Sequence, residues 1–203
     1  ASSSSPGSGA GDAEDLPLQG IPLADLPQLP ARGDGYRSEP IAGVTLVAVL
    51  STVLVAATHG AASASPPRST ASAMVWLIWA EAITAALCTS YLLLVDSGVI
   101  RRSAVSCYPM PAEVEQCLLR NESPGPLSNI PGPAGSPTLG TYCVRCLVWR
   151  PPKERDRGHH CAICQRCVIG FDHHCDVFGR CIVRANMPCF MTVIGMLCAG
   201  MIT

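Results

Sequence analysis

Seven cysteines lie within forty residues near the C-terminal end of the sequence, together with several histidines. Pairs of cysteines separated by two residues are the usual way in which a short loop presents two thiolates to one tetrahedral zinc ion. The potential donors are, in order, Cys143, Cys146, His160, Cys161, Cys164, Cys167, Asp172, His173, His174, Cys175 and Cys181. Two zinc ions need only eight ligands. The surplus suggests that one thiol is available for other chemistry.

Eight of these donors divide into two sets of the same composition, each with three cysteines and one histidine. The first set is Cys143, Cys146, His160 and Cys167, and the second is Cys161, Cys164, His174 and Cys181. Closed tetrahedral sets of this kind stabilise a fold without taking part in a reaction. We therefore expect two structural Zn²⁺ ions in a compact cysteine-rich domain over residues 141–190, with little regular secondary structure.

Cys175 is left over by this assignment, beside the unused Asp172 and His173. A thiol next to an imidazole that a carboxylate orients has the composition of an activated nucleophile. His173 would accept the thiol proton, and Asp172 would hold the ring in the required tautomer and stabilise its cation. The alternative is that Cys175 or His173 is a spare metal ligand.

Two apolar stretches precede the cysteine-rich region, and each is long enough to cross a bilayer. They predict transmembrane helices over 41–62 and 73–95, in which small residues such as Gly43 would let the helices approach closely. Glu81 lies in the middle of the second stretch. It is either a carboxyl hydrogen-bonded to a neighbouring helix, which we favour, or a polar group near a substrate. Residues 189–203 are apolar but short, and predict the truncated start of a third helix in a fragment.

Positive charge flanks the two predicted helices on the same side. Arg37 precedes the first helix and Arg101 and Arg102 follow the second, whereas the loop between them carries only Arg68. The positive-inside rule then places both ends of this helix pair, and the cysteine-rich domain after it, in the cytosol. A reducing compartment also suits thiolate ligands.

The remaining segments are rich in Pro, Gly and Ser. We expect a disordered tail over 1–36 and a flexible cytosolic linker over 103–140. The predicted fold class is an α-helical integral membrane protein, with two full transmembrane helices, the start of a third and a cytosolic two-zinc domain. The net charge of −1 gives no basic field that would indicate a nucleic-acid partner.

The cysteine-rich segment resembles the DHHC palmitoyltransferases, and the resemblance extends over residues 41–203. The matching features are Cys143-x2-Cys146 with Arg150-Pro151-Pro152 after it, His160-Cys161-x2-Cys164-x2-Cys167, Phe171-Asp172-His173-His174-Cys175, Cys181, and Asn186-x3-Phe190. Asp96-Ser97-Gly98, after the second apolar stretch, is similar to the Asp-Pro-Gly motif of that family.

The resemblance implies a protein S-acyltransferase in which Cys175 is the nucleophile, His173 and Asp172 activate it, and the eight remaining donors bind zinc. Cys175 would take a fatty acyl group from acyl-CoA and pass it to substrate proteins with membrane-proximal cysteines. The implied location is a multi-pass membrane protein in contact with membrane lipid, in the Golgi, the ER or the plasma membrane. The alternative is a catalytically weak zinc-binding scaffold that recruits protein partners to a membrane.

The chain departs from the family pattern after the motif. Asp176-Val177 stands where Pro-Trp is usual, and Arg180 replaces an Asn and would neutralise Asp176. Four basic residues of the domain either contact the CoA phosphates or are solvated loop charges. They are Arg145, Lys153, Arg155 and Arg157.

Overall fold

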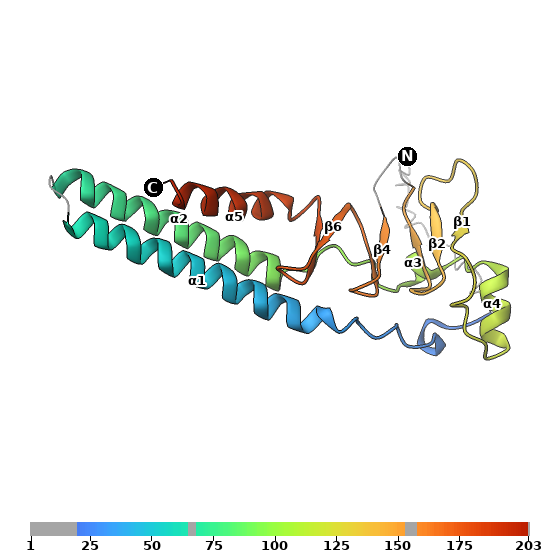
Figure 1. Cartoon of the computed structure of the whole chain (residues 1–203). Coiled ribbons are helices and arrows are strands. Elements are labelled where there is room, and N and C mark those ends of the chain that lie inside the picture. Colours follow the sequence, from blue (N-terminus) through green and yellow to red (C-terminus); the bar gives the residue numbers. More distant parts are fainter. Residues whose placement is uncertain (1–19, 65–67, 153–157, 203) are drawn as a thin grey trace, which may run out of the picture.

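The computed structural model describes residues 20–64, 68–152 and 158–202. The molecule is elongated, with three long helices at one end and a row of short β-hairpins at the other (Figure 1). The basic residues Lys153, Arg155 and Arg157 and the first nineteen residues of the predicted tail lie outside the described residues.

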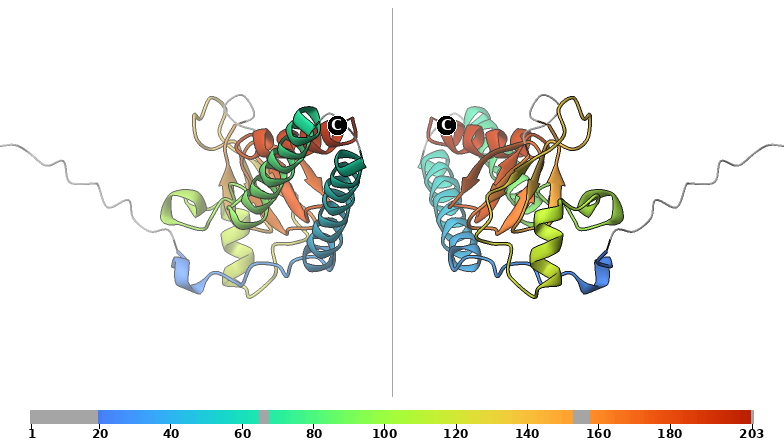
Figure 2. Two further views of the ribbon diagram at one scale, coloured as in Figure 1. Left: turned by 90° about the vertical axis from the view of Figure 1, so that its left-hand side faces the viewer. Right: turned by 90° about the vertical axis from the view of Figure 1, so that its right-hand side faces the viewer.

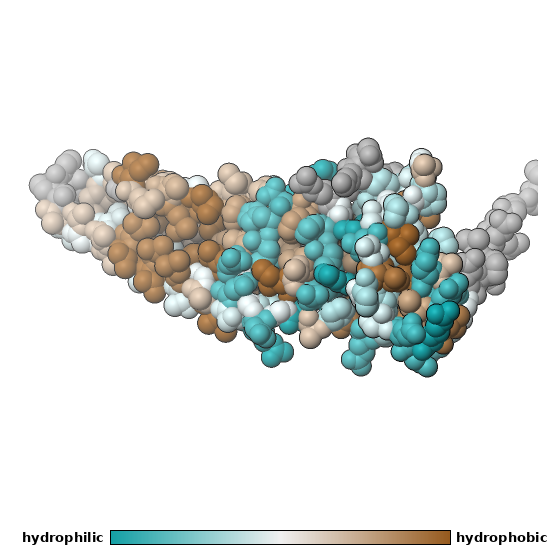
Figure 3. All heavy atoms as spheres, turned by 45° about the vertical axis from the view of Figure 1, so that its right-hand side comes forward, coloured by the Kyte–Doolittle hydropathy of each residue, from teal (hydrophilic) through white to brown (hydrophobic). Residues whose placement is uncertain are grey.

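Two helices are long and apolar enough to cross a membrane: α1, Gly35–Ala64, and α2, Arg68–Leu94. α1 includes the predicted segment 41–62, and α2 includes the predicted segment 73–95 except for its last residue. Their apolar side chains face outward, as with Trp76 at 77% exposure and Leu94 at 84%. Apolar surface that gathers on one part of a molecule marks contact with lipid or a partner. Figure 3 shows this surface over the helices, with the hydrophilic surface over the hairpins.

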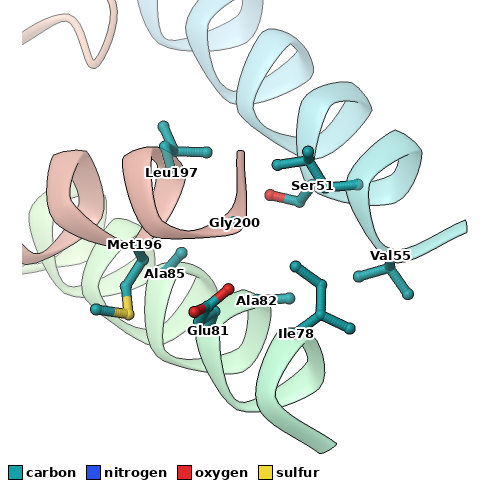
Figure 4. Close-up of a pocket in the computed structure, with 10 residues that line it drawn as sticks. Ser51, Val55, Ile78, Glu81, Ala82, Ala85, Met196, Leu197 and Gly200 are labelled. Atoms are coloured by element: carbon teal, nitrogen blue, oxygen red, sulfur yellow. The ribbon is translucent and has the colours of Figure 1, made fainter. Parts of the chain in front are cut away.

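Helix α5, Met187–Gly200, lies in the apolar end of the molecule and packs against α2. Glu81 is buried at 8% exposure, and its carboxylate lies near Ser51 and Gly200 in a small cavity between α1, α2 and α5 (Figure 4). The cavity has a volume of about 10 Å³, which is room for one water molecule at most. Glu81 therefore faces the interior of the helix bundle.

Within the described residues, seven short strands form three small antiparallel sheets. The first is β1, Ile130–Pro131, with β2, Thr141–Cys143, and β3, Val148–Arg150; the second is β4, His159–Cys161, with β5, Arg166–Val168; the third is β6, Phe171–Cys175, with β7, Arg180–Val183. The cysteine-rich region therefore has more regular structure than we expected, because each loop that carries ligands is the turn of a hairpin. Figure 1 shows β6 nearest the long helices, β4 next and β2 farthest away.

The predicted linker over 103–140 folds against the first sheet rather than hanging free. It contains α3, Ala104–Cys107, and α4, Ala112–Leu119. Cys107 and Val114 are fully buried, and the Trp149 indole Nε1 donates a hydrogen bond to the Pro109 carbonyl at 2.7 Å. These apolar side chains cover one face of the hairpin β2–β3, which could not bury both of its faces alone.

Residues 20–34 also differ from the predicted tail, because they run along one side of the hairpins (Figures 1 and 2). This segment includes the short helix η1, Leu23–Asp25. The Gly33 amide donates to the Ile163 carbonyl at 2.8 Å, and the Arg166 guanidinium donates to the Pro30 carbonyl at 2.8 Å. The segment is ordered by hydrogen bonds from the hairpins, which its own composition does not indicate.

Candidate active site

The structure brings the first predicted set of donors together. The Sγ atoms of Cys143, Cys146 and Cys167 lie 3.6, 3.2 and 3.8 Å from Nδ1 of His160. All four donor atoms lie within 4.8 Å of one another, and the three cysteines are buried.

The second predicted set converges in the same manner. The Sγ atoms of Cys161, Cys164 and Cys181 lie 3.5, 3.5 and 3.8 Å from Nδ1 of His174. A tetrahedral zinc ion with ordinary bond lengths to sulfur and nitrogen separates those two atoms by about 3.6 Å. Both sets therefore have the chemistry and the spacing of a zinc tetrahedron and could hold a metal ion.

The protonation of the donors points in the same direction. Hydrogen bonds to Cys143 and Cys146 raise the pKa of the Cys167 thiol, and hydrogen bonds to Cys161 and Cys164 raise the pKa of the Cys181 thiol. Hydrogen bonds to Cys143 and Cys146 likewise raise the pKa of His160 to about 10. Three buried thiols cannot all ionise side by side, and a divalent cation would remove that conflict.

Each set is assembled from two neighbouring hairpins. The turn of one hairpin supplies a Cys-x2-Cys pair, and a histidine and a cysteine that face each other across the next hairpin complete the set. The facing pairs are His160 with Cys167 and His174 with Cys181. The residue after each second turn cysteine, Leu147 or Gln165, has a positive φ, which bends the backbone around the donors.

The third hairpin repeats the second at an offset of fourteen residues, which separates His160 from His174 and Cys167 from Cys181. In this repeat Cys175 takes the position of the first turn cysteine, and Phe178 takes the position of the second. After β7 the chain continues into α5 instead of another hairpin. Cys175 is thus placed like a metal ligand but lacks the partners that would complete a third set.

The Cys175 thiol lies instead at the end of the helix bundle. It packs against an apolar cluster to which α1, α2, the turn, β7 and α5 each contribute a buried side chain. The cluster consists of Val47, Leu92, Phe178, Ile182 and Val193. Two further cysteines, Cys88 and Cys189, border the same cluster. The thiol is half-buried, so it remains accessible to a reactant.

Asp172 and His173 lie on β6, the strand that ends at Cys175. The Asp172 Oδ2 atom and the His173 Nδ1 atom are 2.8 Å apart, and both side chains are partly exposed. This contact leaves Nε2 as the free nitrogen of the ring. Because side chains alternate along a strand, His173 projects on the same side as Cys175. The ring also meets Phe190 of α5 edge to face at 5.2 Å between centroids.

Glu39 is a site residue that the sequence analysis missed. Its Oε2 atom lies 3.0 Å from Nε2 of His174, the nitrogen that faces away from the second set of cysteines. A carboxylate in this position orients a metal-bound histidine and increases its basicity. The available signal was an acidic residue immediately before the first apolar stretch.

The family comparison concerns this same part of the chain. Residues 137–203 match the family described as DHHC palmitoyltransferase. This part of the chain is a DHHC domain. The family predicted from the motif and its spacing is therefore confirmed.

Curated relatives agree with that assignment. Palmitoyltransferase ERF2 of Eremothecium gossypii is 32% identical over 92 residues, which cover 42% of this chain and 24% of that protein. Probable protein S-acyltransferase 3 of Arabidopsis thaliana is 47% identical over 60 residues, which cover 28% of this chain and 14% of that protein. The chain spans about a quarter or less of the length of these relatives.

The turn after the motif docks the DHHC domain onto α1. A Cβ atom on Gly43 would collide with the Val177 carbonyl, and one on Gly179 would collide with Pro40. Gly43 therefore lets α1 approach the turn that begins at Cys175, rather than only another helix as expected. Asp176 lies near Glu39 and His174.

Arg180 does not neutralise Asp176 within the part of the chain that the structure describes. Its guanidinium donates to the Gly179 carbonyl at 3.0 Å and lies over the Tyr36 ring. Arg145 is exposed in the turn between β2 and β3.

The Asp96-Ser97-Gly98 segment connects α2 to the DHHC domain. Asp96 accepts a hydrogen bond from the Val99 amide at 3.0 Å and pairs with Arg101 at 2.9 Å. The hydrogen bond from Val99 and the charge and hydrogen bond of Arg101 lower the pKa of the Asp96 carboxyl. Gly98 has a φ of 73°, and its carbonyl accepts from the Ile169 amide. The motif thus fixes the second hairpin against the end of α2.

Proposed function

We propose that the protein is a protein S-acyltransferase that transfers a fatty acyl group from acyl-CoA to cysteine thiols of substrate proteins through a thioester on Cys175. One observation carries the proposal. Cys175 belongs to neither donor set, shares strand β6 with an Asp172–His173 pair, and packs against the apolar cluster at the end of the helices. The relatives named palmitoyltransferase and protein S-acyltransferase support the same activity.

In the first step, His173 accepts the proton of the Cys175 thiol, and Asp172 stabilises the resulting imidazolium. The thiolate attacks the carbonyl carbon of acyl-CoA. The bond from that carbon to the CoA sulfur breaks, and CoA leaves as a thiol after taking the proton from His173. The products are S-acyl-Cys175 and free CoA.

In the second step, His173 takes the proton from a cysteine thiol of the substrate protein. That thiolate attacks the carbonyl of S-acyl-Cys175, and the bond to the Cys175 sulfur breaks. The proton on His173 returns to Cys175, so that the enzyme is restored. Both steps exchange one thioester for another and need no further energy source.

The acyl chain would enter the helix bundle at the apolar cluster around Cys175. Each methylene moved from water into hydrocarbon contributes about 0.8 kcal/mol, so a long chain strongly favours a site that borders the membrane. We propose that both donor sets bind Zn²⁺, because their sulfur and nitrogen atoms have the separations of a zinc tetrahedron. The ions would hold the three hairpins together and fix His174 beside Cys175.

The test uses the protein in membranes, incubated with an alkyne-labelled palmitoyl-CoA. We expect a label that hydroxylamine removes, because hydroxylamine cleaves thioesters, and we expect Cys175→Ser to abolish it. His173→Ala should slow labelling by about a hundredfold. Zinc content, measured in the same samples, should stay at two equivalents in both variants.

Cys189→Ser is the matched control, because Cys189 borders the same apolar cluster. Labelling in this variant should equal that of the wild type. If Cys189→Ser loses the label and Cys175→Ser keeps it, the thioester forms on Cys189, and the proposal is contradicted. Absence of any label on the wild-type protein would contradict the proposed activity itself.

A further inference from the structure

A groove lies on the surface where α1 begins and α2 ends. It has a volume of about 510 Å³, and it lies between the N-terminal segment, the end of α2 and the second and third hairpins. Five arginines line it: Arg32, Arg101, Arg102, Arg166 and Arg180. The acidic residue among the lining residues is Asp96, which already pairs with Arg101.

Three of these guanidiniums converge. Arg32 lies 3.9 Å from the centroid of the Tyr36 ring, and Arg180 lies 4.7 Å from the same centroid. The pKa of Arg32 is lowered, first by partial burial and then by the positive charge of Arg166, with Arg180 adding to it. Like charges are thus held close together, and repulsion between them is relieved when an anion binds.

The donors of these guanidiniums are only partly used. Arg166 gives hydrogen bonds from Nη1 to two carbonyls, those of Pro30 and Gln165, and Arg180 gives one from Nη1 to Gly179. A guanidinium carries five N–H donors. Several donors therefore remain for an oxyanion, and guanidinium pairs bind phosphate in a bidentate manner.

One wall of the groove is apolar and is formed by the end of α2. It includes Leu93, Leu94 and Val95, of which Leu94 is 84% exposed. A soluble phosphate compound has no apolar group to pack against this wall, whereas the acyl chains of a phospholipid would pack along it. Basic clusters at the cytosolic end of a membrane helix attract anionic lipid headgroups.

We propose that this groove binds an anionic phospholipid, with its phosphate on Arg32, Arg166 and Arg180 and its acyl chains along the end of α2. The residues that line the groove include neither Cys175 and His173 nor any member of the apolar cluster around Cys175. The lipid site is therefore separate from the acylation site. It anchors the second and third hairpins to the membrane surface.

Native mass spectrometry of the detergent-purified protein tests this site, with dioctanoyl phosphatidic acid and dioctanoyl phosphatidylcholine as probes. We expect phosphatidic acid to bind at least tenfold more tightly than phosphatidylcholine. Arg32→Ala and Arg180→Ala should each weaken the binding of phosphatidic acid about tenfold, as expected for the loss of one charge-assisted contact. Arg120→Ala, which removes an exposed arginine directly after α4, should leave it unchanged.

Competition experiments distinguish a phospholipid from a soluble phosphate compound as the ligand of the groove. Inorganic phosphate and CoA, each at the concentration of the lipid, should not displace phosphatidic acid. Displacement by either compound would assign the groove to a soluble phosphate and overturn the proposal. Wild-type affinity in Arg32→Ala would overturn it as well, and this variant decides the matter if Arg180→Ala has lost zinc. Phosphatidic acid should still bind to Cys175→Ser, so the lipid site is tested independently of the proposed acyltransferase activity.

Discussion

Glu39 and His174 are 135 positions apart in the chain, yet their side chains make a direct contact of 3.0 Å. The carboxylate is 22% exposed and the imidazole 7%, so solvent screens the contact only partly. His160, the equivalent histidine of the first set, has no hydrogen-bond partner for its Nε2 atom among the described residues. The two metal sets therefore differ in what supports their histidine, although their ligands are the same.

This difference predicts that Glu39→Gln weakens the second site selectively. The loss of a carboxylate behind a metal-bound histidine lowers metal affinity about tenfold or more. We expect one of two zinc equivalents to leave more readily than in the wild type when the protein is titrated with a chromogenic chelator. Glu122→Gln, at an exposed position after α4, is the control. Release of both ions at the wild-type rate in Glu39→Gln would show that the contact does not support the metal.

At the scale of elements, α1 serves two purposes. Most of its length is apolar and exposed, but its first turns contact the DHHC domain through Tyr36, Glu39, Pro40 and Gly43. The turn that follows Cys175 rests on this part of the helix. The position of Cys175 thus depends on a helix that begins 140 residues earlier in the chain.

Gly43→Ala tests that dependence. The added methyl group would meet the Val177 backbone carbonyl, so either α1 or the turn must move. We expect acylation of Cys175 to fall at least tenfold, while both zinc equivalents are retained. Gly60→Ala is the matched control, because Gly60 lies in the same helix and a Cβ atom there meets nothing within 4 Å. Equal labelling of the two variants would show that the turn tolerates displacement.

For the whole molecule, the metal sets connect hairpins that have small cores of their own. Cys143, Cys146 and Cys167 belong to the same buried cluster as Tyr142 and Trp149. Metal binding and folding are therefore expected to be the same equilibrium in this domain.

Removal of zinc by a strong chelator should unfold the DHHC domain and leave α1 and α2 helical. We expect loss of near-ultraviolet circular dichroism from Trp149, with little change in the helical signal at 222 nm. Cys143→Ser or His174→Ala should lower the zinc content below two equivalents. Full metal content in either variant would contradict the ligand assignment.

The sequence predicts some parts of this molecule far better than others. The eight donors and the free thiol follow from spacing alone, because a Cys-x2-Cys pair is a local arrangement. The two apolar helices follow from length and composition. Glu39 and the groove around Arg32 do not, since they depend on where segments distant in the chain meet.

The order of residues 20–34 and 103–140 was also missed, for a different reason. Proline and glycine lower the intrinsic tendency of a segment to fold, but they do not prevent a neighbouring surface from holding it. Trp149 holds Pro109, and Arg166 holds Pro30. The composition of these segments indicates how they behave in isolation, but it does not reveal the surface against which they pack.

The interleaved hairpins connect the two donor sets in series. The middle hairpin contributes its strands to one set and its turn to the other. Alkylation of Cys146, at the end remote from the membrane, would release His160 and Cys167 and loosen the hairpin whose turn carries Cys161 and Cys164. Cys175, the proposed nucleophile, would then lose its support without itself being modified, so its reactivity would report on the integrity of all three hairpins.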